Sequence, residues 1–109
     1  MNGDQLMAKL LKKEGTEWIS CFPAQTLIEA CSQEGIRPVL CRQERAGVNM
    51  ADAYSRIHNG NKIGVFTMQH GPGAEHAFGG VAQAYADNVP MLLIPGLSLI
   101  HISEPRDRG

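Results

Sequence analysis

The stretch IGVFTMQHGPGAEHAFGGVAQAYADNVPMLLIPG, residues 63–96, decides the fold of this chain. It opens with a continuous apolar run, Ile63 to Met68, passes through a glycine loop into an alanine-rich helical pattern, and ends in a second apolar run, Met91 to Ile94. Neither run alternates apolar with polar residues. Strands of this kind are buried on both faces, and a helix between them is the usual crossover of a parallel pair. The stretch therefore predicts a β-α-β unit.

The residues before this unit show the same alternation. Short apolar segments predict strands at Trp18 to Phe22 and Pro38 to Cys41. Apolar residues at helical spacing predict three helices. The first follows Asp4, a plausible cap, and ends at Gly15, and the second runs from about Gln25 to Glu34 and ends at Gly35. The third runs from Ala46 to His58 and is ended by Asn59-Gly60-Asn61. On these helices and the later one, we expect the core to be faced by Leu27, Ile28, Cys31, Gly47, Met50, Ala51, Tyr54, Ile57, Ala77, Val81, Ala84 and Tyr85. The predicted fold is α/β, a doubly wound parallel sheet with helices on both faces, here incomplete.

Composition limits the possible functions. A length of 109 residues allows at most one domain, and 43% hydrophobic with 19% charged residues is typical of a soluble globular protein rather than of disorder or a coiled coil. The net charge of -1 gives no reason to expect nucleic acid or an anionic membrane as a partner. No apolar run approaches the roughly 20 residues of a membrane helix, and the start does not resemble a signal peptide, so we expect a cytoplasmic protein.

The cysteines and histidines do not indicate a metal site. Cys21, Cys31 and Cys41 lie ten residues apart, a spacing that fits neither paired zinc ligands nor an even set of disulfides. We expect buried or half-buried thiols. His70 and His76 are not joined by an HxH or HExxH spacing, so no metal ligand is assigned.

Unusual residues follow three of the predicted strands. They are Phe22-Pro23-Ala24-Gln25, Arg42-Gln43-Glu44, and the loop from Met68 to Gly73. In an open parallel sheet, ligands bind beyond the carboxyl ends of the strands, where loops and helix N-termini meet. All three segments should therefore lie on one edge of the domain.

Two of these features have an ordinary structural explanation as well as a functional one. A carboxylate such as Glu44 at a helix N-terminus is favoured by the helix dipole alone, by up to about 1 kcal/mol, so it need not bind anything. Gly71 and Gly73 allow a ligand to approach the main chain, but glycines are also how a strand turns into a helix. The loop is neither a P-loop nor a GxGxxG, so phosphate binding has weak support.

The last residues break the pattern. LSLIHISEPRDRG, residues 97–109, stands where a doubly wound domain would need another helix and strand, and it closely resembles the translation of a transposase-type sequencing adapter. We expect the genuine sequence to end near Gly96, which makes residues 1–96 a truncated domain and residues 97–109 a non-native tail. The alternative is a natural tail with a short strand from Leu97 to Ile102.

Three landmarks together resemble one family. LMAKLLKKEGTEWISCFPA, CRQERAGVNMADAYSR and GPGAEHAFGGVAQAYADNVPMLLIPG are similar to the N-terminal pyrimidine-binding (PYR) domain of thiamine diphosphate-dependent enzymes, of the acetolactate synthase, benzoylformate decarboxylase and pyruvate decarboxylase type. The resemblance covers roughly Met1 to Gly96, with the landmarks in the family's order and at its separations. The last landmark is the most specific, since it matches the glycine loop, helix, Asp-x-x-Pro turn and strand.

The resemblance gives Glu44 a catalytic role. In the family this glutamate hydrogen-bonds N1′ of the cofactor's aminopyrimidine and favours its imino tautomer, whose nitrogen then removes the C2 proton of the thiazolium so that C2 can attack a 2-keto acid. A carboxyl group can share a proton in this way, whereas an amide cannot.

Other site residues are carried over from the family's motifs. The cofactor-binding positions are Pro23, Ala24, Gly71, Gly73 and His76 beside Glu44, with Ala24 where the family usually has glycine and His76 where it often has asparagine. Gln25, Gln69 and His70 fall at substrate-facing positions and would tune which keto acid is used.

The family also implies what this chain lacks. Its members bind the diphosphate and Mg²⁺ through a separate domain with a GDG motif and a downstream asparagine, usually from a second subunit, and nothing here matches that motif. We therefore expect the 109 residues alone to be inactive as an enzyme. The first hypothesis is a lyase or carboligase acting on 2-keto acids, acetolactate synthase-like, in a homo-oligomer; FAD is not indicated. The alternatives are a non-catalytic interaction module, or one subunit of a split enzyme such as a keto-acid decarboxylase.

Overall fold

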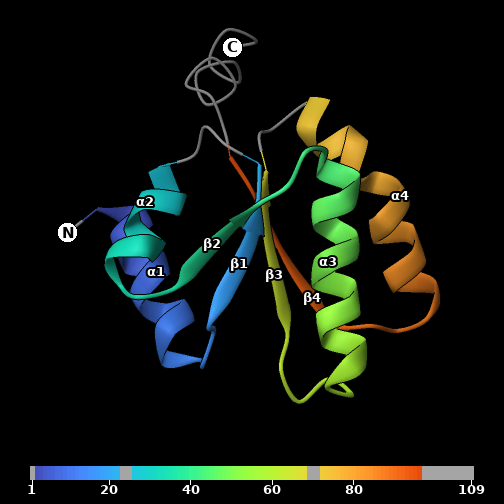
Figure 1. The fold of residues 1–109 in the computed structure, drawn as a ribbon, viewed down its shortest axis with the longest axis horizontal. Coiled ribbons are helices and arrows are strands. Elements are labelled where there is room, and N and C mark those ends of the chain that lie inside the picture. Colours follow the sequence, from blue (N-terminus) through green and yellow to red (C-terminus); the bar gives the residue numbers. More distant parts are fainter. Residues whose placement is uncertain (1, 23–25, 69–71, 97–109) are drawn as a thin grey trace, which may run out of the picture.

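The computed structural model describes residues 2–22, 26–68 and 72–96. Within these ranges helices and strands alternate along the chain (Figure 1). The elements are α1 (Gly3–Lys13), β1 (Trp18–Cys21), α2 (Thr26–Gln33), β2 (Arg37–Leu40), α3 (Glu44–Ile57), β3 (Gly64–Met68), α4 (Pro72–Ala86) and β4 (Met91–Pro95). In this part of the chain, no helix is both long enough and apolar enough to cross a membrane.

The four strands form one parallel sheet in the order β2-β1-β3-β4. The chain moves outward from β1 to β2, crosses back to β3 and continues to β4, so the winding direction reverses between β1 and β3. Helices α1 and α2 cover one face of the sheet, and α3 and α4 cover the other (Figure 1). The predicted doubly wound fold is confirmed. In such a sheet a ligand crevice forms at the carboxyl ends of the two strands where the direction reverses.

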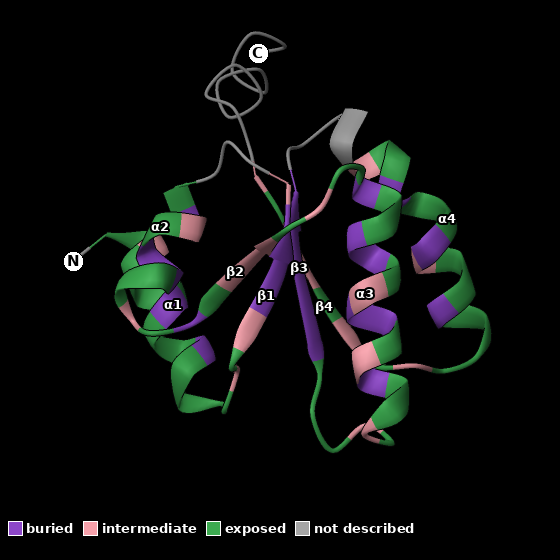
Figure 2. Cartoon of the chain, in the orientation of Figure 1, coloured by how far each residue is buried: buried purple, intermediate pink, exposed green. Residues whose placement is uncertain are grey.

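Successive residues of β3 support a core on each face, because side chains alternate across a strand. Val65 joins the cluster beneath α1 and α2, whereas Phe66 joins the cluster beneath α3 and α4. The first cluster consists of Ala8, Leu11, Ile19, Leu27, Ala30, Cys31, Ile36 and Val65, and the second of Val48, Ala51, Phe66, Met68 and Ala77. Figure 2 shows β3 buried along its whole length between these two layers.

The start of the first helix differs from the prediction. Asn2, not Asp4, is the cap: its side chain accepts a hydrogen bond from the Gln5 amide, and the Gln5 side chain accepts one from the Asn2 amide, each at 2.9 Å. This reciprocal pair satisfies two helix-end donors at once. The Asp4 carboxylate instead accepts a hydrogen bond from the Thr26 hydroxyl and so links α1 to α2.

Helices α1 and α2 end near the predicted glycines, but two residues that were expected to face the core do not. Gly15 and Gly35 take positive φ angles of 92° and 82° where α1 and α2 end. Ile57 and Tyr85, both expected inside, are 77% and 84% exposed. On α3 the buried face contains polar residues instead, Asp52 and Ser55 among them. A helical pattern that counts only apolar residues therefore predicts the wrong side of such a helix to be buried.

The fourth strand is also less buried than expected. Leu92 is 42% exposed, and β4 forms an edge of the described sheet, as β2 does. An edge strand has a neighbour on one side only, so continuous apolar sequence does not ensure burial there.

Candidate functional site

Glu44 is the first residue of α3, beside the carboxyl ends of β1 and β3. The helix begins two residues earlier than Ala46, its predicted start, and Gln43 caps it without a side-chain hydrogen bond. The Glu44 residue is only 6% exposed. An acid that serves the helix dipole alone normally stays in water, since burying a charge carries a desolvation cost. The burial of Glu44 therefore favours a role beyond helix capping.

Hydrogen bonds anchor the start of α3 over the end of β1. The Ser20 hydroxyl, buried in β1, donates to the Gly47 carbonyl at 2.8 Å. The Cys41 amide donates to the Cys21 carbonyl at 2.9 Å, and the Cys41 thiol donates to the same oxygen at 3.2 Å. The main chain on both sides of Glu44 is thus tied to β1, which fixes where its carboxylate enters the edge of the sheet.

Close packing against β3 fixes the depth of the same helix. A Cβ on Gly47 would lie 2.2 Å from Cε1 of Phe66, and a Cβ on Gly64 would lie 2.1 Å from the carbonyl oxygen of Ala51. At distances under 3 Å the neighbouring atoms must shift, so both positions require glycine unless the helix or, at Gly47, the ring of Phe66 moves. Without these glycines α3 would stand further from the sheet and take Glu44 with it.

The side chain that contacts the Glu44 carboxylate comes from helix α4. In the described part of the chain, the Glu44 carboxylate has a single hydrogen-bond partner, His76, whose Nδ1 lies 3.3 Å from Oε1. His76 belongs to the first turns of α4, and its side chain is 70% exposed, against 8% for Glu44. The imidazole of this pair therefore faces solvent, whereas the carboxylate is buried.

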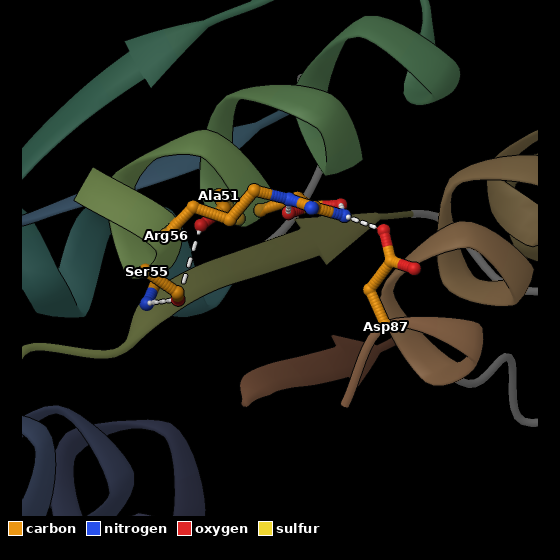
Figure 3. Close-up of polar contacts among 6 residues, drawn as sticks. Ala51, Ser55, Arg56 and Asp87 are labelled. Atoms are coloured by element: carbon orange, nitrogen blue, oxygen red, sulfur yellow. Dashed lines mark hydrogen bonds and ion pairs between the residues drawn. The ribbon is translucent and has the colours of Figure 1, made fainter. Parts of the chain in front are cut away.

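The far ends of α3 and α4 are joined by an ionic network. Nε of Arg56 donates to Oδ1 of the buried Asp52 at 2.6 Å, and Nη2 of Arg56 donates to Oδ2 of Asp87 at 2.8 Å (Figure 3). The hydrogen bonds that Arg56 donates to both carboxylates raise the pKa of Arg56 above its usual value. Since Asp87 directly follows α4, this network fixes the spacing of the helices at the end opposite Glu44.

Ser55 joins the same end of α3 to β3. Its hydroxyl accepts a hydrogen bond from the Gly64 amide at 2.8 Å and donates one to the Ala51 carbonyl at 3.2 Å (Figure 3). A buried hydroxyl needs such partners to offset its desolvation. Because Gly64 begins β3, the bond sets the register between helix and strand.

Most other predicted site residues lie outside the described residues. These are Pro23, Ala24, Gln25, Gln69, His70 and Gly71. Gly73 lies in the first turn of α4. The residues that border the two segments are close together, since the Phe22 amide donates to the Thr67 carbonyl at 3.3 Å. The roles assigned to all these residues remain predictions.

The cysteines are free thiols, as expected. Cys21 and Cys31 are buried and Cys41 is half-buried. Burial raises the pKa of Cys21 and of Cys31 to about 11. A thiol with so high a pKa is protonated at neutral pH and is a poor nucleophile. Over residues 2–22, 26–68 and 72–96, no three His, Cys, Asp or Glu side chains gather as metal ligands would.

A cavity of about 640 Å³ lies at the opposite edge of the sheet, by the amino ends of β1, β3 and β4. Its lining includes Trp18, Tyr54 and Lys62. No sequence pattern indicated this cavity, because its wall combines residues of helices, strands and loops that are far apart in the chain. It is remote from Glu44, since α3 runs from one edge of the sheet to the other.

Comparison with known proteins identifies the family. The family described as "Thiamine pyrophosphate enzyme, N-terminal TPP binding domain" matches residues 1–104. The acetolactate synthase large subunit of Haemophilus influenzae is 34% identical over 100 residues, covering 88% of this chain and 17% of that protein. A Pseudomonas aeruginosa protein named "Probable 2-ketoarginine decarboxylase AruI" is 33% identical over 101 residues, covering 90% of this chain and 18% of that protein.

A solved structure supports the fold independently. The crystal structure of benzoylformate decarboxylase from Polynucleobacter necessarius superposes with a TM-score of 0.75 at 23% sequence identity, covering 90% of this chain and 19% of that one. The present chain spans less than a fifth of the length of the proteins it matches. On the family match and these relatives, the chain belongs to the thiamine pyrophosphate enzymes, and it corresponds to their N-terminal TPP-binding domain.

Proposed function

We propose that Glu44 activates thiamine diphosphate (thiamine pyrophosphate) in an acetolactate synthase-like enzyme that acts on 2-keto acids. The observation that carries this proposal is a nearly buried carboxylate at the carboxyl edge of the sheet, beside the strands where the winding direction reverses. A carboxylate there can accept a hydrogen bond from a protonated ring nitrogen or return the proton to it.

The residues present fit the aminopyrimidine half of the cofactor. Glu44 offers a carboxylate with little access to water, and its Oε1 lies 3.3 Å from Nδ1 of His76. When bound, the cofactor supplies the carbon nucleophile that attacks the keto acid. The protein's part is to hold a proton at the Glu44 carboxylate, to keep water away from it, and to fix its direction through the anchored start of α3.

The remaining site residues are proposed from the family's motifs. Pro23, Ala24, Gly71 and Gly73 would lie along the pyrimidine, and Gln25, Gln69 and His70 would face the keto acid. Their support is their position in sequence, directly after β1 and between β3 and α4, on the edge where Glu44 lies. Substitutions at Gln25, Gln69 and His70 should then change which keto acid is preferred more than they change cofactor binding.

The second half of the site would come from elsewhere. We propose that this domain is part of a longer polypeptide that forms a cytoplasmic homo-oligomer. A diphosphate-binding domain of a second subunit would hold the diphosphate and Mg²⁺. The support is that this chain spans 17% of an acetolactate synthase large subunit. The chain alone would then be inactive. No observation here favours FAD.

The test is Glu44→Gln in the longer polypeptide that contains this domain. Thiamine-dependent turnover of pyruvate should fall about 100-fold or more, because an amide cannot exchange a proton with the ring nitrogen. Glu75→Gln is the matched control, since it removes a carboxylate from an exposed position on α4. Retained turnover in Glu44→Gln would remove Glu44 from its assigned role.

Keto-acid decarboxylation is the second candidate function. It is favoured by the similarity to the protein named as a 2-ketoarginine decarboxylase. The product distinguishes the two: a carboligase joins two keto-acid carbon units, whereas a decarboxylase releases an aldehyde. A gene in which this domain is followed by no diphosphate-binding domain would favour a split enzyme or a non-catalytic module instead.

A further inference from the structure

The resemblance predicts His76 as a cofactor-binding position, and its contact with Glu44 indicates how it would act there. We propose that His76 is a positioning residue: its imidazole Nδ1 orients the Glu44 carboxylate so that the remaining oxygen faces the cofactor. The inference rests on the proposed function and deepens it, since it concerns how the activating carboxylate is aimed. It involves no contact between His76 and the substrate.

The geometry supports a directional hydrogen bond. An ionised carboxylate only accepts, so when Glu44 is ionised the hydrogen bond requires the tautomer with its hydrogen on Nδ1, which lies 3.3 Å from Oε1. Oε1 is thereby engaged from the α4 side. The inference assigns the other oxygen, Oε2, to the side that would face a ligand at the edge of the sheet.

The contact joins two helices whose spacing is fixed independently of it. A Cβ on Gly80 would lie 2.5 Å from Cγ1 of Val48, so α3 and α4 are in close contact near their middle. Arg56 and Asp87 join them at the far end. Figure 1 shows both helices starting at the same edge of the sheet. His76 therefore approaches Glu44 from a fixed direction.

The exposure of His76 argues against a mainly structural role. Its side chain is 70% exposed, so His76 itself adds little to the packed core. A glutamate side chain, in contrast, has several rotatable bonds, and holding it in one orientation before the ligand arrives removes an entropy cost from binding. The contact should therefore raise cofactor affinity and turnover.

Asparagine is the informative substitution. Its Nδ2 is separated from Cα by the same number of bonds as Nδ1 of histidine, so it can donate to Oε1 from the same place. Alanine removes the donor altogether. His76→Asn and His76→Ala thus form a matched pair that keeps or deletes the hydrogen bond.

The test uses the longer polypeptide and measures the dissociation constant of thiamine diphosphate by titration calorimetry, together with steady-state kinetics. His76→Ala should raise this dissociation constant about fivefold or more and lower kcat, with KM for the keto acid unchanged. His76→Asn should restore both values to within about twofold. Glu75→Ala, on the adjacent exposed residue, should change neither. His76→Asn, which keeps the donor, should also keep the thermal midpoint of the parent protein.

A double-mutant cycle isolates the action through Glu44. In a Glu44→Ala background, which lacks the side-chain acceptor, His76→Ala should have no further effect on the dissociation constant. An equal effect in both backgrounds would mean that His76 acts on the cofactor directly and would overturn the inference. So would a His76→Ala protein that binds and turns over like the parent. If instead Glu44→Gln keeps its turnover, the proposed function fails, while the cycle still reports whether the two residues are coupled.

Discussion

Gly47 on α3 lies directly against the ring of Phe66 on β3, since a Cβ at position 47 would come within 2.2 Å of Cε1. The contact sets the height of α3 above the sheet, three residues from Glu44. It connects the packing of the core to the position of the proposed catalytic carboxylate.

Gly47→Ala should destabilise the protein by about 1–3 kcal/mol, because an added methyl group in a packed core forces the ring or the helix to move. Urea unfolding of the chain measures the change. Gly79→Ala is the matched control: a Cβ there would meet only Nε of Arg45, at 3.9 Å, so alanine should stabilise α4 by about 0.5–1 kcal/mol. Equal effects at the two positions would contradict the packing described here.

Asp52 and Asp87 bind the same arginine but should differ in importance. The Asp52 side chain is 5% exposed and that of Asp87 is 52% exposed. Asp52→Asn should cost about 1–3 kcal/mol of stability, because it weakens a buried, charge-assisted hydrogen bond. Asp87→Asn should cost much less, since an exposed ion pair is screened by water and salt. Urea unfolding at low and high salt would test both, and a larger loss for Asp87→Asn would contradict the prediction.

Stability should fall as the pH rises from about 9 to about 11. Burial raises the pKa of Cys21 and of Cys31 from 9.0 to about 11, so the folded protein keeps these protons over a range in which the unfolded chain has lost them. The unfolded state is therefore favoured progressively through this range, whereas below pH 9 the two thiols contribute no pH dependence. Urea midpoints measured from pH 8 to pH 11 should decline less steeply in Cys21→Ala/Cys31→Ala than in the parent chain. Parallel slopes would show that the thiols do not contribute.

The 109-residue chain should bind thiamine and thiamine diphosphate with similar, weak affinity. Its proposed contacts are to the pyrimidine only, so neither the diphosphate nor Mg²⁺ should strengthen binding. Titration calorimetry with and without Mg²⁺ measures this, after circular dichroism has verified the helical content. Glu44→Gln should weaken the binding of both ligands to the same extent. Binding of thiamine diphosphate that is much tighter with Mg²⁺ would indicate that this chain holds the diphosphate itself.

Sequence patterns predicted the element types well where side-chain burial is uniform. The run before Met68 is buried throughout β3, and Gly15 and Gly35 end helices by adopting positive φ. Prediction failed where burial depends on neighbours. Ile57 and Tyr85 have apolar side chains at helical spacing, yet both face solvent, because the buried side of a helix is set by what it packs against.

The sequence by itself determined the alternation of strands and helices, the parallel sheet and the family motif that singles out Glu44. These follow from local periodicity, turn residues and motif order. Only the tertiary structure decided that Glu44 is buried and that His76, 32 residues away, contacts it. The contact depends on the strand order β2-β1-β3-β4 and on the close packing of α3 with α4. Both are set by the fit of distant side chains, which no local pattern encodes.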